Sequence, residues 1–174
     1  KSIYLRREFY VAKKVKDATA YVCGLGFYEF SLNGEKVGDS EFAPLWSDYD
    51  KSVYYNTYDV TSQVKKGGNA IGVLLGNGFY NVQGGRYRKL QISFGAPTLR
   101  FRMVVNYEDG TSETIVSGKD WKYDFSPVLF NCIYGGEDYD ARREQKGWNM
   151  FGFKEQDWRP VVIQEAPKGV LRPQ

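Results

Sequence analysis

The sequence predicts an all-β fold, an antiparallel β-sandwich of the jelly-roll type, and three observations lead to this prediction. Aromatic residues, which favour strands, make up 17% of the 174 residues. Apolar and polar residues alternate with period two in several segments, and no segment shows a sustained helical period. Turn signals rich in glycine separate these segments, as is typical of sandwiches and barrels. The length predicts one such domain over residues 1–174.

In the first half of the chain, the clearest strand signal is the alternation over residues 3–11. One face of that strand carries Ile3, Leu5, Arg7, Phe9 and Val11. Asn33-Gly34 predicts a hairpin with a returning arm at residues 36–38, because both central residues of a type I′ turn need a positive φ. At most a turn or two of helix is expected over residues 61–66. The remaining strands of this half are expected at residues 20–26, 27–33, 52–60 and 70–75.

The second half repeats this pattern. Residues 98–107 alternate, with one face formed by Leu99, Phe101, Met103 and Val105. Asp109-Gly110 then predicts a second hairpin, whose returning strand covers residues 111–116. Further strands are expected at residues 121–125, 129–134 and 161–164, the last of which would close a sheet edge.

The composition excludes several classes of function. A net charge of +3 does not fit a strongly basic nucleic-acid binder, and the absence of histidine excludes imidazole catalysis and histidine-ligated zinc. For that reason nucleic acid is not an expected partner. A membrane is not expected either, because no apolar run is long enough to span one. Cys23 and Cys132 lie in apolar surroundings, and two free core thiols are favoured over one disulfide. A start at Lys1 indicates a piece of a longer protein.

The segment around Trp46 is the first candidate for carbohydrate binding. Trp46 and Tyr49 offer flat rings that can stack on the C–H face of a sugar, and Asp48 and Asp50 offer oxygen ligands for a hard cation such as calcium. Sugar hydroxyls can complete the shell of such an ion. The alternative is that the aspartates only form a turn through bonds between side chain and backbone.

A second candidate lies at the start of a long loop over residues 77–97. Gly76 and Gly78 precede Phe79 and Tyr80, so the two rings either stand at a loop tip or pack on the end of the sandwich. Arg86, Arg88 and Lys89 follow in the same loop, and we interpret them as solvated charges rather than a phosphate site.

The acidic group near residue 137 is the most enzyme-like feature, since glycosidases use paired carboxylates. In an extended strand, however, Glu137 and Asp140 would point to opposite faces. Arg142 and Arg143 follow at once, so a structural network of ion pairs is favoured over a direct contact of Glu137, Asp140 and Arg142 with a ligand. No catalytic residue is expected in this chain.

Four blocks of sequence resemble the N-terminal β-sandwich module of bacterial α-L-rhamnosidases. The first is Gly-Phe-Tyr-Glu-Phe-Ser-Leu-Asn-Gly at residues 26–34, followed by Val-Gly-Asp at 37–39. The second runs from Ala43-Pro44 through Trp46, Asp48 and Tyr49 to residues 55–61. The third and fourth cover residues 69–80, with Phe79 where Trp is common, and residues 135–148. Their order along the chain makes the resemblance specific.

This resemblance implies a galactose-binding-like jelly roll that precedes an (α/α)-barrel catalytic domain. The barrel of that family carries the catalytic carboxylates, so the resemblance implies a non-catalytic module that binds carbohydrate or positions substrate. The alternative is a purely structural sandwich that buttresses the barrel. Some related modules bind L-rhamnose through calcium, and only Asp48 carries over to such a site, with Tyr49 standing where an amide is wanted; no other cofactor is expected. The implied partners are a rhamnose-containing saccharide and the barrel, in a periplasmic or secreted bacterial enzyme.

Overall fold

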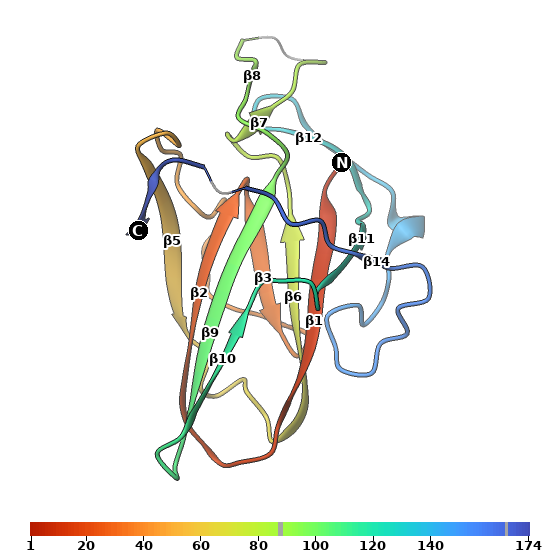
Figure 1. Ribbon diagram of the computed structural model, residues 1–174. Helices are drawn as coiled ribbons and strands as arrows, with labels where there is room; N and C mark the ends of the chain where they lie inside the picture. Colours follow the sequence, from red (N-terminus) through yellow and green to blue (C-terminus); the bar gives the residue numbers. More distant parts are fainter. Residues whose placement is uncertain (87–88, 166) are drawn as a thin grey trace.

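The computed structural model describes residues 1–86, 89–165 and 167–174, and two β-sheets dominate it (Figure 1). The first sheet has the order β14 (Arg159–Pro160), β11 (Lys122–Phe125), β1 (Ile3–Val11), β6 (Gly67–Leu75), β3 (Tyr28–Leu32) and β4 (Glu35–Lys36). The second has the order β10 (Ser112–Val116), β9 (Thr98–Tyr107), β2 (Val15–Leu25), β5 (Ser52–Asp59) and β15 (Val170–Pro173). Neighbouring strands are antiparallel except β15 and β5, which are parallel.

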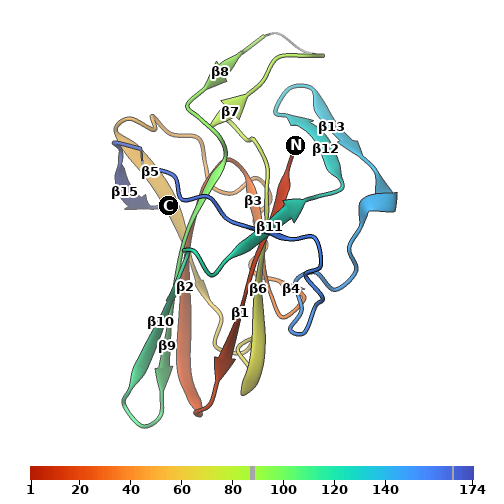
Figure 2. The ribbon, with the colours of Figure 1, turned by 45° about the vertical axis from the view of Figure 1, so that its right-hand side comes forward.

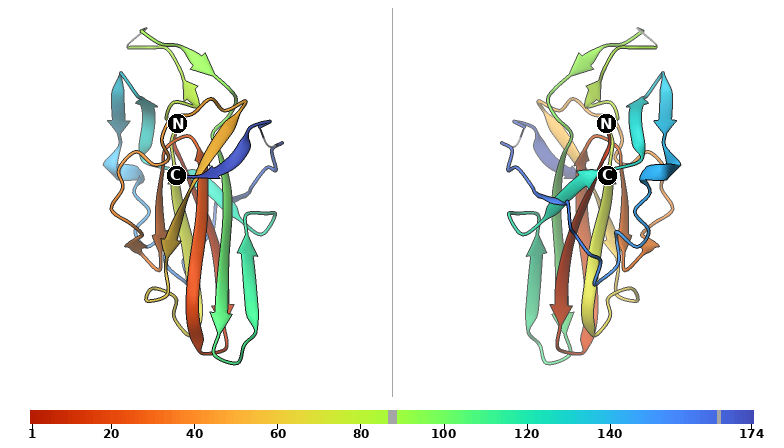
Figure 3. Two further views of the ribbon diagram at one scale, coloured as in Figure 1. Left: turned by 90° about the vertical axis from the view of Figure 1, so that its left-hand side faces the viewer. Right: turned by 90° about the vertical axis from the view of Figure 1, so that its right-hand side faces the viewer.

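The two sheets pack face to face, as the edge-on views show (Figure 3). Their main core contains residues of both sheets, such as Phe9 and Ile71 from one and Val22 and Phe101 from the other. The predicted alternation of β9 is confirmed, because Phe101, Met103 and Val105 are buried. The predicted all-β fold, an antiparallel sandwich of the galactose-binding-like jelly-roll class, is therefore confirmed.

Two small hairpins extend one end of the sandwich (Figure 2). They are β7 (Asn81–Val82) with β8 (Ile92–Ser93), and β12 (Val128–Cys132) with β13 (Gly136–Tyr139). The long predicted loop over residues 77–97 thus contains a short hairpin of its own, and Arg88 lies outside the described residues.

The local predictions for turns and thiols hold in most places. Asn33 and Gly34 both have a positive φ, 54° and 86°, as the type I′ hairpin requires. Gly110 has a φ of 83° in the second predicted hairpin, which connects β9 and β10. Cys23 and Cys132 are buried and free, as expected.

One predicted strand is wrong, and residues 61–66 stay within the turn or two of helix that is the most expected there. Residues 161–164 form no strand, because this segment crosses from β14 in one sheet to β15 in the other instead of running along an edge. Residues 61–66 form a turn rather than a helix: Val64 N–H bonds to Val60 C=O at 3.1 Å, and Gly67 already opens β6. The 3₁₀ helix Ala141–Arg143, which was not predicted, is the only helix among the described residues, and none of them forms a helix long and apolar enough to cross a membrane.

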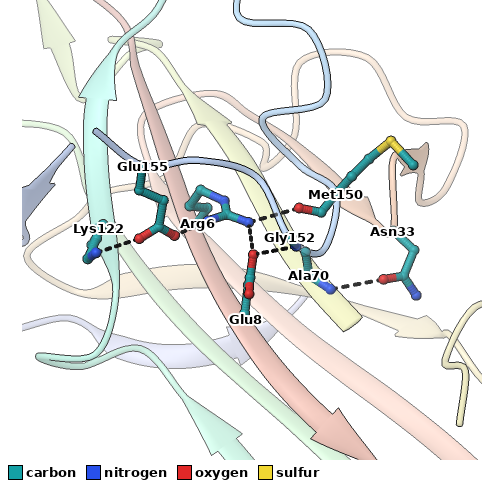
Figure 4. Close-up of polar contacts among 8 residues, drawn as sticks. All are labelled: Arg6, Glu8, Asn33, Ala70, Lys122, Met150, Gly152 and Glu155. Carbon is teal, nitrogen blue, oxygen red and sulfur yellow. Dashed lines mark hydrogen bonds and ion pairs between the residues drawn. The ribbon is translucent and has the colours of Figure 1, made fainter. Parts of the chain in front are cut away.

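The outer face of β1 is covered by residues 144–158, which we call the clamp segment. Tyr4 stacks on Trp148 with ring centroids 4.0 Å apart, and Trp158 lies in the same stack. Arg6, which alternates to this outer face, is fully buried and forms ion pairs with Glu8 of its own strand and Glu155 of the clamp segment (Figure 4). Both faces of β1 are therefore packed.

Candidate functional site

Five aromatic side chains meet at the end of the sandwich that carries the small hairpins, and we call them the end cluster. They are Phe27, Phe42, Trp46, Phe79 and Tyr134. Trp46 lies flat on Phe79, with ring centroids 4.8 Å apart and an angle of 9° between the rings. Phe79 also meets Phe27 edge to face at 5.9 Å. Since these rings come from four different loops, the fold brings together what the sequence separates.

The end cluster lies at the surface. Trp46 is 52% exposed and Phe42 is 74% exposed, although both rings contact other rings. Phe42 has a positive φ of 49°, an uncommon backbone conformation for a bulky residue. Exposed, supported rings of this kind suit a ligand with a flat apolar face.

Tyr49 and Tyr80 do not lie at this surface, which corrects the prediction that they contact a sugar. Tyr49 is 5% exposed and Tyr80 is 7% exposed, and their rings meet edge to face at 4.9 Å. Phe94 of the β8 loop packs on both rings. Burial raises the pKa of Tyr49 to about 12, so its hydroxyl stays protonated. These two residues form a layer under the loop that carries Trp46.

Asp48 lies in a turn, and its carboxylate already has a partner. Its carboxylate accepts a bond from Lys51 Nζ at 2.8 Å, and this partner lowers the pKa of Asp48. Its carbonyl accepts from Ser52 N–H at 2.8 Å. Calcium takes 6–8 oxygen ligands, whereas no group of three or more His, Cys, Asp or Glu that could hold a metal occurs in the described part of the chain. The donor set at Asp48 thus does not fit calcium by itself.

A cavity of about 440 Å³ borders the end cluster. Phe27 and Phe42 form part of its wall, and Glu29, Glu41 and Glu137 contribute carboxylates. Glu29 and Glu41 are both paired with Lys36. Glu137 is exposed and forms no ion pair with any described residue, so its oxygens are the ones available to a ligand beside the rings.

Asp140 and Arg142 form the structural ion pair that was favoured. Asp140 caps the 3₁₀ helix and accepts two bonds from the Arg142 guanidinium, at 2.8 and 2.9 Å. These bonds to Arg142 lower the pKa of Asp140, which therefore stays ionised. Arg142 is 90% exposed, so the pair lies on the surface. A carboxylate held in this state is a poor proton donor.

Sequence reasoning missed three members of the end cluster, namely Phe27, Phe42 and Tyr134. A usable signal exists for two of them: Phe27 follows Gly26 and Tyr134 precedes Gly135, just as Phe79 follows Gly78. An aromatic residue beside a glycine in a turn is thus the pattern that these loops share. Phe42 has no such neighbour, and no sequence signal marks it.

With this geometry established, comparison with known proteins decides the family. The family described as "Alpha-L-rhamnosidase N-terminal domain" matches residues 13–174. The chain belongs to this family. A curated α-L-rhamnosidase of Formosa agariphila is 43% identical over 159 residues, which cover 89% of this chain and 17% of that protein. One of Streptomyces avermitilis is 43% identical and is covered over 15% of its length. The chain therefore spans less than a fifth of these relatives.

Solved structures of α-L-rhamnosidases share the fold of this chain. The α-L-rhamnosidase of Dictyoglumus thermophilum superposes with a TM-score of 0.92 at 40% identity, covering 99% of this chain and 19% of that one. The S. avermitilis enzyme, solved with L-rhamnose, gives 0.90 at 40% identity, over 97% of this chain and 16% of that one. A lectin of Pleurotus ostreatus gives 0.61 at 15% identity, over 97% of this chain and 39% of the lectin, and shares the fold alone.

Proposed function

We propose that this N-terminal domain is a non-catalytic carbohydrate-binding or substrate-positioning module of an α-L-rhamnosidase, and that it binds sugar at the end cluster. The observation that carries the proposal is the half-exposed Trp46 ring, held flat by Phe79. One face of the indole is covered by Phe79, and the other is free to stack on the C–H face of a pyranose. Support from Phe79 orients the ring before the sugar arrives, which lowers the entropic cost of binding.

Hydroxyl recognition would come from the adjoining cavity. Glu137 places an unpaired carboxylate on the same cavity as Phe27 and Phe42, and carboxylates accept strong bonds from sugar hydroxyls. Tyr49 and Tyr80 act below this surface, where they hold the Trp46 loop against β5 and the β7–β8 hairpin. In this proposal Asp140 and Arg142 fix the chain after β13 and do not touch the sugar.

Bond cleavage is assigned to the rest of the parent protein. Asp140 is held ionised by Arg142, which makes it a poor general acid for glycoside cleavage. The parent's substrate is proposed to be a rhamnose-containing saccharide, because the relatives are named α-L-rhamnosidases.

Calorimetric titration of this domain with L-rhamnose, with and without calcium, tests the proposal. We expect saturable heat at millimolar sugar. Trp46→Ala should weaken the sugar affinity at least about tenfold, which is a loss of about 1.4 kcal/mol in binding free energy. Tyr10→Ala is the matched control, because Tyr10 is an exposed aromatic residue on β1 outside the cluster. If binding requires calcium, the sugar affinity should rise only when calcium is present, and this rise should disappear in Asp48→Asn. Equal losses in both aromatic variants would contradict the assignment.

A structural role is the second candidate, and the same exposed rings support it. Phe42, Leu45 and Trp46 are all more than half exposed, and an apolar surface of this kind also suits contact with the rest of the parent polypeptide. The structural role would be favoured if no heat appeared at any sugar concentration and the Trp46 fluorescence showed a buried indole in the full-length enzyme. Release of an aryl leaving group from an aryl rhamnoside by this domain alone, lost in Glu137→Gln, would contradict both candidates.

A further inference from the structure

The charged side chains that line the cavity beside the end cluster are all acidic. Of the described residues in its wall, only Glu29, Glu41 and Glu137 carry a charge, and neither a lysine nor an arginine is among them. The other polar groups of the wall, such as those of Ser2 and Asn131, are uncharged. A ligand that enters this cavity therefore meets charges of one sign.

This negative charge is compensated only in part. Lys36 Nζ lies 2.8 Å from a Glu41 carboxylate oxygen and 3.7 Å from one of Glu29. Three carboxylates against one ammonium group leave a surplus of negative charge, because Glu137 has no cationic partner among the described residues. A carboxylate without a partner is costly to bury under an apolar polypeptide surface, whereas the hydroxyls of a sugar can donate to it.

A hydrogen-bond network fixes the hairpin that carries Glu137 relative to the stacked rings. Glu137 pairs with Asn131 across the β12–β13 ladder. The Asn131 side chain accepts a bond from Asn77 N–H at 2.7 Å and donates to Ser2 Oγ at 2.9 Å. Asn77 is buried and precedes Phe79, the ring that supports Trp46, by two residues. The backbone at Glu137 thus keeps its place beside the rings when a sugar binds.

Two cations border the end cluster without lining the cavity. Arg86 is paired with Asp138, and its guanidinium lies 4.9 Å from the centroid of the Phe130 ring. Lys89 Nζ lies 5.8 Å from the centroid of the Tyr134 ring. Lys89 is therefore the charge that competes with Glu137 for an anionic ligand, and its removal forms one arm of the test.

We propose that the end cluster takes neutral saccharides and discriminates against saccharides that carry a carboxylate or sulfate group, with Glu137 as the specificity-determining residue. This inference rests on the proposed function and names the substrate class of the same site. A neutral sugar donates its hydroxyl protons to the Glu137 carboxylate. An anionic sugar brings a like charge to a cavity that already has a negative surplus, and such a repulsive element is a common source of specificity.

Two disaccharides that differ in one group test the proposal by calorimetric titration of this domain. One links L-rhamnose to glucose, and the other links it to glucuronic acid, which has a carboxylate in place of the CH₂OH group. We expect the glucuronic acid compound to bind at least about fivefold more weakly at low salt. At about 1 M salt the difference should shrink to less than about twofold, because salt screens charges at a surface.

Glu137→Gln should move the two affinities in opposite directions. Loss of the negative charge should strengthen binding of the glucuronic acid compound about threefold. The glucose compound loses its charged acceptor, so its binding should weaken by about the same factor. A merely structural role of Glu137 would instead weaken both compounds together.

Glu35→Gln is the matched control for this variant. Glu35 is exposed, does not line the cavity, and pairs with Leu32 at the other end of β3 from the cavity-lining Tyr28. Both affinities should stay within about twofold of the wild type.

Three outcomes would overturn the proposal and leave the sugar site itself intact. They are equal affinities of the two compounds in the wild type, parallel losses of both affinities in Glu137→Gln, and tighter binding of the glucuronic acid compound that disappears in Lys89→Gln. Absence of heat with either compound would contradict the proposed function together with this inference.

Discussion

Trp148 and Trp158 of the clamp segment stack with Tyr4 of β1 in one layer. The rings of the end cluster, by contrast, stack at the surface. Both regions are rich in aromatic residues, and both gather them from distant parts of the chain. They differ in what accompanies the rings: the clamp encloses a fully buried arginine with two carboxylates, and the end cluster borders an open cavity with one unpaired carboxylate. The first arrangement holds the fold together, and the second is the proposed ligand site.

The largest effect is expected from removing the charge at the centre of the clamp. In Arg6→Ala, Glu155 and Glu8 lose their shared partner, and the clamp segment loses the bond to Met150 C=O at 2.9 Å. Breaking a buried ion pair on one side costs about 3–5 kcal/mol, to be measured by urea unfolding. Arg7→Ala is the matched control on the same strand, because Asp120, the partner of Arg7, is 62% exposed, and the loss should be less than about 1 kcal/mol. Equal losses of stability in Arg6→Ala and Arg7→Ala would show that the clamp segment does not depend on Arg6.

A smaller effect is expected at the glycine that lets the clamp segment lie close to the sheet. A Cβ atom at Gly72 of β6 would come within 2.5 Å of Asn149 Cβ and 2.9 Å of Trp148, so Gly72→Ala must push the clamp segment outward. We expect a loss of about 1–3 kcal/mol in the free energy of unfolding and a weaker signal from the stacked tryptophans in near-UV circular dichroism. In Gly118→Ala the new atom would meet only Asp120 at 3.5 Å, and a change within about 0.5 kcal/mol is expected.

The comparison also separates what the sequence predicts from what it does not. Strand alternation and the Asn33-Gly34 turn are local signals, and they predict the sandwich and its hairpins. Arg6 alternates to the outer face of β1 and therefore appears exposed in the sequence; its burial depends on Glu155, 149 residues away. Tyr49 and Trp46 lie three residues apart in one loop, yet only Tyr49 is buried, because Phe94 from the β8 loop packs on it. Contacts over such distances leave no local pattern.

At the end cluster, the same kind of truncation should cost much less stability. Trp46→Ala removes a ring that is already half exposed, so we expect a loss of about 1 kcal/mol in the free energy of unfolding. Trp158→Ala is the matched change at the clamp, where the ring is buried and a loss of about 3 kcal/mol is expected. A loss at Trp46 equal to that at Trp158 would mean that the end cluster is part of the core and not a ligand surface.

The smallest effect is expected just above pH 10, where both regions respond in the same direction. Burial raises the pKa of Tyr4 in the clamp and of Tyr49 under the end cluster, each to about 12, whereas an unfolded tyrosine titrates near pH 10. The raised pKa means that the unfolded chain loses these protons first. Their contribution to stability is therefore complete below pH 10 and is lost as the pH rises towards 12.

Single replacements show whether this alkaline loss is shared between the two regions. Neither the Tyr4 nor the Tyr49 hydroxyl forms a hydrogen bond within the described residues, so Tyr4→Phe and Tyr49→Phe should change stability little at pH 7. Each variant should lose less stability than the wild type between pH 10 and pH 11, as urea unfolding at each pH would measure. Tyr10→Phe, at an exposed position, should follow the wild-type curve. If only Tyr4→Phe flattens the curve, then the layer under the end cluster admits solvent, and Tyr49 becomes a possible ligand contact after all.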